Sequence, residues 1–325
     1  MIPPQLTSQL ALAADSALLP ILQQGAPFQN KPRHEVGFVA AAVLGGVPAI
    51  ANAWRPILQP VGYQLKISGV FCHQAPEATF TDLNGVTRSC ELADLLLVVE
   101  DLTSATQNRR WATLIQAKMA AAKGGKTITE KRDLRQLDLF TRWPAFKLPS
   151  GYCSKPRDFS TCSYSGTTLD CGSYGLINKQ PNPKWHQQAP AKTMPPGGHQ
   201  LGSFLAHMLT TGLSGFGREA TGTGDDWSRT VEDLMNVTFT KAFNYATGFG
   251  QKSQSRGKMA MAFMEFDGWH REDHMNYIYI GDFPPSGWPP EYPEEGDPEG
   301  NGISILRVGI MRDGMHDTPR VRRWI

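Results

Sequence analysis

The chain has 325 residues, of which 40% are hydrophobic and 19% are charged, as is typical of a soluble globular protein of one large or two modest domains. The net charge of +2 is nearly neutral and by itself does not indicate a nucleic-acid partner. Five cysteines, an odd number in a chain of this size, do not fit a disulfide scaffold and favour a reducing, cytoplasmic location. The first lysine is Lys31, so we expect no signal peptide.

The first 150 residues combine helical and strand patterns. Helical spacing of apolar residues predicts helices over residues 5–24, 34–44 and 128–140. Alternating or continuous apolar runs predict strands over residues 63–71, 78–80, 92–99 and 111–118. Residues 36–54 carry no charge, but Pro48, Asn52 and many small residues favour a buried helix over a membrane span. Asn84 and Gly85 form a turn signal, and residues 103–110 read as a loop.

The second half gives weaker signals. Helices are expected over 201–211 and 227–242, the second with Asp225 and Asp226 as candidate N-caps. Strands are expected over residues 258–266, 277–280 and 303–310, whereas residues 151–190 have no clear period and residues 284–300 read as a surface loop. We expect an α/β unit over residues 1–150. Residues 151–325 then form either an α+β elaboration of that unit or a separate accessory module.

Three polar residues stand at informative places in two of the predicted strands. Asp94 lies near the start of an otherwise apolar strand, and Gln116 and Lys118 lie near the end of the next. The i, i+2 spacing puts Gln116 and Lys118 on one face of their strand. Hydrolysis of a phosphodiester bond needs a divalent metal held by oxygen ligands and a cation that offsets developing negative charge. A carboxylate, an amide and a lysine brought together on neighbouring strands can supply these functions.

This pattern resembles the PD-(D/E)XK, or restriction-endonuclease-like, nuclease superfamily in its D…QxK variant, over roughly residues 30–145. His34 and Glu35 stand where that family often has a His or Glu before its first core strand. Gln136 to Phe140 is similar to the QxxxY motif of RecB-like members, with Phe in place of Tyr. Gln116 replaces the usual acid, as in Mrr-like members, and Glu91 can supply the missing negative charge. The resemblance implies a mixed central sheet flanked by helices.

The resemblance also implies a Mg²⁺-dependent nuclease that cuts DNA, with Mn²⁺ as a possible substitute for Mg²⁺. Asp94 and Gln116 would hold the metal with Glu91 or Glu35, and Lys118 would orient or help deprotonate the attacking water. From Arg109 to Lys147, ten basic residues oppose Glu130, Asp133 and Asp138, a local charge of +7. Within this block we expect contacts with the phosphate backbone from Lys123, Lys126, Arg132, Arg135 and Gln136.

Several alternatives remain open at this stage. The chain could be a catalytically inactive nucleic-acid-binding or scaffold protein on the same fold, or an RNase. A metal hydrolase built on His270 and His274 is a weaker alternative. Structural zinc is not expected, because Cys153, Cys162 and Cys171 lack a close CxxC pair. By analogy with restriction-like enzymes we expect a restriction or antiphage defence setting, a homo-oligomer, an activating protein or small signal, and no membrane association.

Overall fold

A computed structural model of the chain describes residues 2–26, 31–72, 76–104, 109–121, 124–161, 168–178, 183–210, 216–221, 224–246, 261–268, 274–280 and 302–313. Its largest feature is a mixed sheet. The strands of this sheet are β1 Tyr63–Cys72, β4 Leu95–Asp101, β5 Arg109–Met119, β8 Gly172–Asn178, β9 Lys184–Gln188, β11 His199–Gln200, β12 Arg218–Glu219, β13 Met261–Asp267, β14 His274–Ile280 and β15 Ser304–Arg312. Within the described residues the strand order is β11-β9-β8-β5-β4-β15-β1-β13-β14, and β12 pairs with β5.

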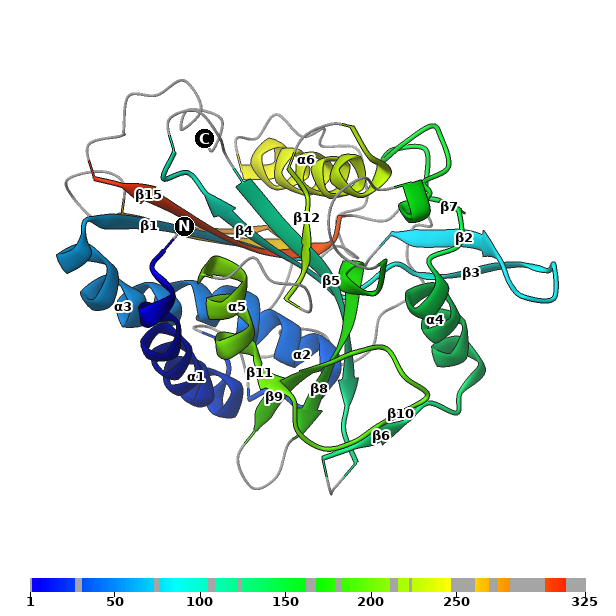
Figure 1. The fold of residues 1–325 in the computed structure, drawn as a ribbon, viewed down its shortest axis with the longest axis horizontal. Coiled ribbons are helices and arrows are strands. Elements are labelled where there is room, and N and C mark those ends of the chain that lie inside the picture. The colour runs from blue at the N-terminus through cyan, green and yellow to red at the C-terminus, as the bar shows by residue number, and fades with distance from the viewer. Residues whose placement is uncertain are drawn as a thin grey trace.

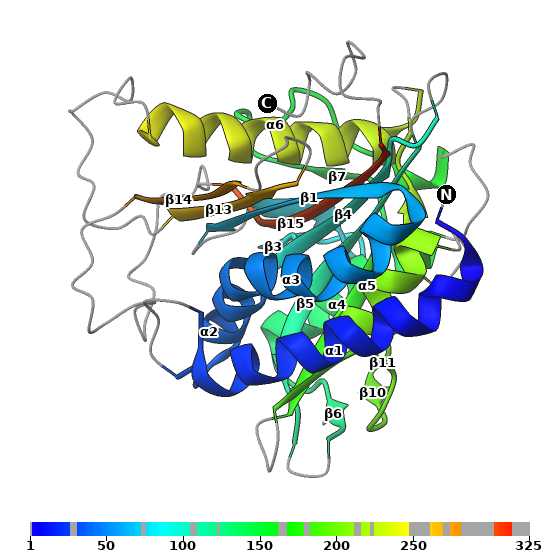
Figure 2. The same cartoon turned by 90° about the vertical axis from the view of Figure 1, so that its left-hand side faces the viewer.

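Helices cover both faces of this sheet (Figures 1 and 2). One face packs against α1 Thr7–Gln24, α2 Glu35–Ala40, the π-helix η2 Ala41–Gly45, α3 Gly46–Leu58 and α5 Leu201–Thr210. The other face packs against α4 Lys131–Arg142 and α6 Asp226–Ala246. The remaining helical turns are η1 Pro4–Leu6, η3 Gln59–Val61, η4 Phe159–Thr161 and η5 Thr168–Cys171. The chain is therefore a mixed α/β protein with a large mixed sheet between helical layers.

Two small sheets lie beside the main one. The first has the order β3-β2-β7, with β2 Glu77–Thr81, β3 Thr87–Glu91 and β7 Phe146–Lys147. The second pairs β6 Lys126–Thr127 with β10 Thr193–Met194. Strand β3 runs into the short segment that contains Asp94, so this hairpin is continuous along the chain with the predicted site.

The N-terminal helices pack closely on the central strands. Trp54 of α3 is fully buried, and its Nε1 donates a hydrogen bond of 2.8 Å to the carbonyl of Leu10 in α1. A Cβ atom at Gly69 of β1 would lie 2.8 Å from the carbonyl oxygen of Val43, so this glycine allows η2 to approach the strand. The stretch Glu35–Val61 is long and apolar enough to cross a membrane by length and composition, yet 72% of its most apolar window is buried inside the protein.

The predicted helices over residues 5–24, 34–44, 201–211 and 227–242 and the predicted strands over 63–71, 78–80, 111–118 and 303–310 are confirmed to within a few residues. Helix α4 begins three residues later than the predicted 128–140 segment, and β4 begins at Leu95 rather than Leu92. Asp225 caps α6, since its Oδ1 accepts a hydrogen bond of 2.8 Å from the Ser228 amide. Residues 151–190, which show no clear period in the sequence, contain the strands β8 and β9.

The chain on either side of residue 150 contributes to one sheet. Strand β15 lies between β4 and β1, pairing parallel with β4 and antiparallel with β1. Strand β8 pairs parallel with β5. Residues from both sides of position 150 therefore pair within one sheet, and β15 joins β4 to β1.

Candidate active site

The register of β4 and β5 brings together the three residues singled out in the sequence. Leu95 pairs with Ile115, and the Asp94 amide donates a hydrogen bond of 3.0 Å to the carbonyl of Ile115. This register places Asp94, which lies just before β4, opposite Gln116. Gln116 and Lys118 share one face of β5, because side chains alternate along a strand. Leu114, on the same face, belongs to the core cluster that contains α4.

Asp94 and Gln116 are joined by hydrogen bonds. Asp94 Oδ2 accepts one from the Ala117 amide at 2.7 Å and another from Gln116 Nε2. On its other side, Gln116 Oε1 accepts a hydrogen bond of 2.8 Å from Gln136 Nε2 of α4. Gln116 and Gln136 are both buried. Gln136, predicted to contact nucleic acid, thus lies behind the site in this structure and fixes the amide of Gln116.

Lys118 forms a buried ion pair that the sequence did not indicate. Its Nζ lies 2.9 Å from Asp133 Oδ1, and the two side chains are 10% and 11% exposed. Asp133 is in the first turn of α4, three residues before Gln136, so both point from one face of the helix toward the sheet. In the sequence Asp133 counted only as an acid opposing the basic block. Its i, i+3 spacing with Gln136 was the signal that could have identified it.

Glu35 and Glu91 approach the same site from two other elements. Glu35 is the first residue of α2, and its Oε1 accepts a hydrogen bond of 2.7 Å from the Met119 amide at the end of β5. Glu91 is the last residue of β3, and its carboxylate lies 2.9 Å from a guanidinium nitrogen of Arg132 in α4. Both predicted acids therefore lie beside Asp94 and Lys118, whereas His34 is exposed at the N-cap of α2.

The crowding of carboxylates perturbs the titration of the site. Burial and the negative charges of Glu91 and Glu35 raise the pKa of Asp94 from 3.8 to about 8, although Lys118 and the Ala117 amide lower it. Burial lowers the pKa of the Lys118 ammonium, but the charges of Asp94, Glu35 and Asp133 outweigh this effect and raise it above its usual 10.5. Lys118 is therefore a cation at neutral pH, whereas Asp94 resists ionisation there.

The donor set fits a hard divalent cation that keeps several waters. Mg²⁺ takes oxygen ligands and needs only one or two protein carboxylates. Asp94 offers a carboxylate whose Oδ1 makes no hydrogen bond to any described residue, and Gln116 offers an amide. In the part of the chain that the structure describes, no three His, Cys, Asp or Glu side chains form a group suited to a metal. A cation here would thus depend on the Gln116 side chain and on water.

Tyr174 of β8 extends the site by one strand. Gln116 pairs with Tyr174 across the β5–β8 ladder, so Asp94, Gln116 and Tyr174 form a row on three adjacent strands. The Tyr174 hydroxyl is buried without a hydrogen-bond partner among the described residues. Burial and then the charges of Asp133, Cys90 and Asp94 raise its pKa. Its ring lies 5.7 Å from that of Phe140, the residue in the place of the RecB-like tyrosine. The sequence gave no signal for this position.

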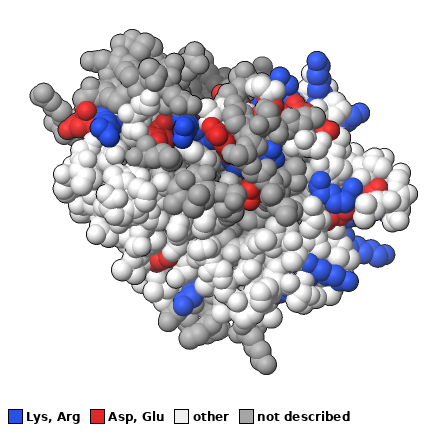
Figure 3. Space-filling view, viewed as in Figure 1, with Lys and Arg blue, Asp and Glu red and all other residues white. Residues whose placement is uncertain are grey.

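The predicted backbone-contacting residues differ in exposure. Arg135 is exposed, Arg132 is 66% exposed despite its pairing with Glu91, and Lys126 on β6 is half-buried. Lys123 lies outside the described residues. Figure 3 shows Lys and Arg side chains on the side of the molecule where α4 and the β2–β3 hairpin lie, while the surface over α1 and α3 carries little charge.

The other candidate signals are not part of this site. Trp54, Trp111, Trp143 and Trp227 are buried core residues, as expected. The described cysteines Cys72, Cys90, Cys153 and Cys171 form no disulfide with one another. Cys162, His270 and the side chain of His274 lie outside the described residues.

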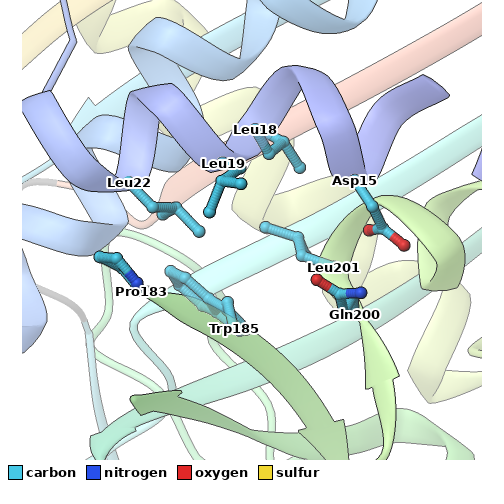
Figure 4. A pocket seen from close by; sticks show the side chains of 8 residues that line it. All are labelled: Asp15, Leu18, Leu19, Leu22, Pro183, Trp185, Gln200 and Leu201. Carbon is cyan, nitrogen blue, oxygen red and sulfur yellow. The ribbon is translucent and has the colours of Figure 1, made fainter. Parts of the chain in front are cut away.

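A shallow pocket between α1 and the β9–β11 region contains none of the site residues (Figure 4). Its lining is mostly apolar, and its one carboxylate, Asp15, accepts hydrogen bonds from the amide and hydroxyl of Ser203. The pocket therefore presents no free charged group to a ligand.

No family model, no curated protein and no solved structure matches this chain. Its function has to follow from the residues of the site themselves.

Proposed function

We propose that this protein is a Mg²⁺-dependent nuclease of the restriction-endonuclease-like type that hydrolyses phosphodiester bonds in DNA. The observation that carries the proposal is the convergence of Asp94, Gln116 and Lys118 on one face of adjacent strands, with Glu35 and Glu91 beside them. A carboxylate, an amide and a buried cation have little structural reason to cluster, since burying charges is costly unless they serve a purpose.

The chain's own residues divide the chemistry between them. Asp94 and Gln116 would hold the cation, which supplies Lewis-acid stabilisation of the phosphate and a more acidic bound water. Gln136 donates a hydrogen bond to the Gln116 amide oxygen, and both amides have to turn over before that oxygen can face a cation at Asp94. Lys118 stays protonated, so it is suited to offset negative charge that develops on the phosphate rather than to remove a proton from water. Asp133 holds the Lys118 ammonium on the site face of β5.

The test is cleavage of supercoiled plasmid with Mg²⁺ or with EDTA. The Lys118→Met variant is compared with Lys184→Met, a control that changes an exposed lysine of β9. We expect nicking or linearisation that requires Mg²⁺, is lost in Lys118→Met and is retained in Lys184→Met. Cleavage by Lys118→Met at the wild-type rate would show that the residues around Lys118 are not the active site. An RNA substrate run in parallel decides between a DNase and an RNase.

One observation favours a second candidate, a catalytically inactive nucleic-acid-binding protein on the same fold. In the described residues the site lacks a group of three metal-binding acids, and the Gln116 amide nitrogen faces Asp94. For the amide oxygen to face a cation at Asp94, the side-chain amide has to turn over. Thermal stability with and without Mn²⁺, measured for wild type and Asp94→Asn, separates the candidates. A metal-dependent rise in Tm that disappears in Asp94→Asn supports the enzyme.

A further inference from the structure

The tip of the β2–β3 hairpin exposes apolar side chains. Leu83 is 78% exposed, the highest value among the large hydrophobic residues that the structure describes, and Val86 is 44% exposed. In Figure 1 this hairpin projects from the body of the protein beyond α4. The base of the hairpin is buried, with Phe80 and Cys90 in the core cluster that contains α4. Leu83 and Val86 are therefore exposed to solvent at the tip of a hairpin whose strands pack against the core.

The tip is held in one shape by Asp82. Its Oδ1 accepts hydrogen bonds of 2.9 Å from the amides of Asn84 and Val86, and its Oδ2 lies 2.9 Å from Arg88 Nε. Gly85 takes the positive φ of 75° that this turn requires. Leu83 is therefore presented by an ordered turn, which lowers the entropy lost when the tip contacts a partner.

Two exposed cations without an ion pair among the described residues lie on elements next to the hairpin. Lys147 of β7 is exposed and lies opposite Thr79 in the register. Arg135 is exposed on α4, the helix that also contributes Gln136 and Asp133 to the site. Two further arginines of α4, Arg142 and Arg132, are paired with Asp138 and Glu91. An apolar tip with exposed cations on the neighbouring elements is complementary to DNA, whose phosphates flank an apolar stack of bases.

The hairpin connects this tip directly to the candidate active site. Asp94 lies eleven positions after Leu83, and a fully extended chain of that length spans at most about 40 Å. Base pairs in DNA are spaced by about 3.4 Å, so this reach corresponds to no more than about twelve base pairs. A duplex in contact with Asp94 and the tip at once therefore needs no more than about that length between them.

We propose that the β2–β3 hairpin is a duplex-DNA contact in which Leu83 inserts between base pairs, no more than about twelve base pairs from the bond that is cut. Leucine wedges of this kind partly unstack a base step and bend the duplex. The inference deepens the proposed function and rests on it, because it takes DNA as the substrate and specifies the double-stranded form.

The test measures binding of a 30-base-pair duplex by fluorescence anisotropy in EDTA, so that no cleavage occurs. Leu83→Ser changes the tip, and Leu12→Ser is a matched control, because Leu12 is 71% exposed on α1. We expect Leu83→Ser to bind about five- to thirtyfold more weakly, from the loss of one buried leucine contact. Leu12→Ser should bind as wild type does. The slope of log Kd against log salt should be unchanged in Leu83→Ser but shallower in Lys147→Gln.

A second measurement locates the insertion. Duplexes carrying 2-aminopurine at successive positions should brighten at one step when wild type binds, and not when Leu83→Ser binds. Equal affinity of wild type and Leu83→Ser would overturn the inference and leave the nuclease proposal standing. A change in the size-exclusion elution volume of Leu83→Ser would also overturn the inference, because it would show that the tip is a contact between copies of this chain. If DNA binding needs Leu83 but no Mg²⁺-dependent cleavage is seen, the proposed hairpin contact is supported and the proposed nuclease activity is refuted.

Discussion

Lys118 and Asp133 give a prediction that separates stability from catalysis. Lys118→Met removes the ammonium but keeps the apolar stem, so it leaves the buried Asp133 carboxylate without the cation that lies 2.9 Å away. Removing one partner of a buried ion pair costs roughly 3–5 kcal/mol. Asp133 lies in the first turn of α4, where the free amides of the helix N-terminus offset about 0.3–1 kcal/mol of this penalty. We therefore expect the variant to lose roughly 2–5 kcal/mol of unfolding free energy.

The double variant Lys118→Met/Asp133→Asn removes both charges. Replacing a buried pair by uncharged groups of similar size is often neutral, so its unfolding free energy should lie within about 1 kcal/mol of the wild-type value. Urea unfolding at pH 7, followed by tryptophan fluorescence, measures all three proteins. Plasmid cleavage should be absent from both variants. A Lys118→Met protein as stable as wild type would refute the buried pairing, and cleavage by the stable double variant would refute the catalytic role of Lys118.

Three other predictions test the fold and the surroundings of the site. Glu100, buried between Arg307 and Arg110, has its pKa lowered from 4.5 to about 2, because these guanidinium charges outweigh its burial. Its contribution to stability is present above pH 4.5 and is lost as pH falls toward 2, so Glu100→Gln should lower Tm at pH 7 by several degrees and far less near pH 2. Tyr174→Phe removes a buried hydroxyl that has no partner among the described residues, so urea unfolding should show no loss of stability; a loss above about 2 kcal/mol would reveal a partner. A fragment of residues 1–150 lacks β15, the strand between β4 and β1, and should show no cooperative thermal transition by circular dichroism; a sharp transition would make that segment an independent domain.

The site residues on β4 and β5 could be predicted because their signals are local. A continuous apolar run predicts a buried strand, and the i, i+2 spacing of Gln116 and Lys118 fixes their common face. The Asp133 pairing depends instead on how α4 packs against β5. Helical spacing shows that Asp133 and Gln136 share a face, but a single sequence does not show which strand that face meets.

Strand β8 was not predicted because residues 151–190 show no clear period in the sequence. A Cβ atom at Gly172 of β8 would lie 2.7 Å from ring atoms of both Phe140 and Trp143. The glycine is therefore required by close packing of α4 aromatic rings against a buried strand, not by a turn. Strand β8 also pairs with β5 in parallel across a long connection, so no hairpin signal marks it. Tyr174, which follows two residues later, was missed for the same reason.

The raised pKa of Asp94 lowers the stability of the folded protein at neutral pH, because a carboxyl group with the ordinary pKa would ionise there. Burial and the neighbouring carboxylates Glu91 and Glu35 raise the pKa of Asp94 to about 8, so Asp94 resists ionisation across neutral pH. A purely structural role would favour the opposite arrangement, with a nearby guanidinium, as at Glu100. At Asp94, Lys118 only partly offsets the effect of burial and of the neighbouring carboxylates on the pKa, and Lys118 itself is held by Asp133. Acids whose pKa is perturbed this strongly cluster at sites where a bound cation or a reaction uses them. The contrast between Glu100 and Asp94 is thus the physical reason to look for a divalent cation at the ends of β4 and β5.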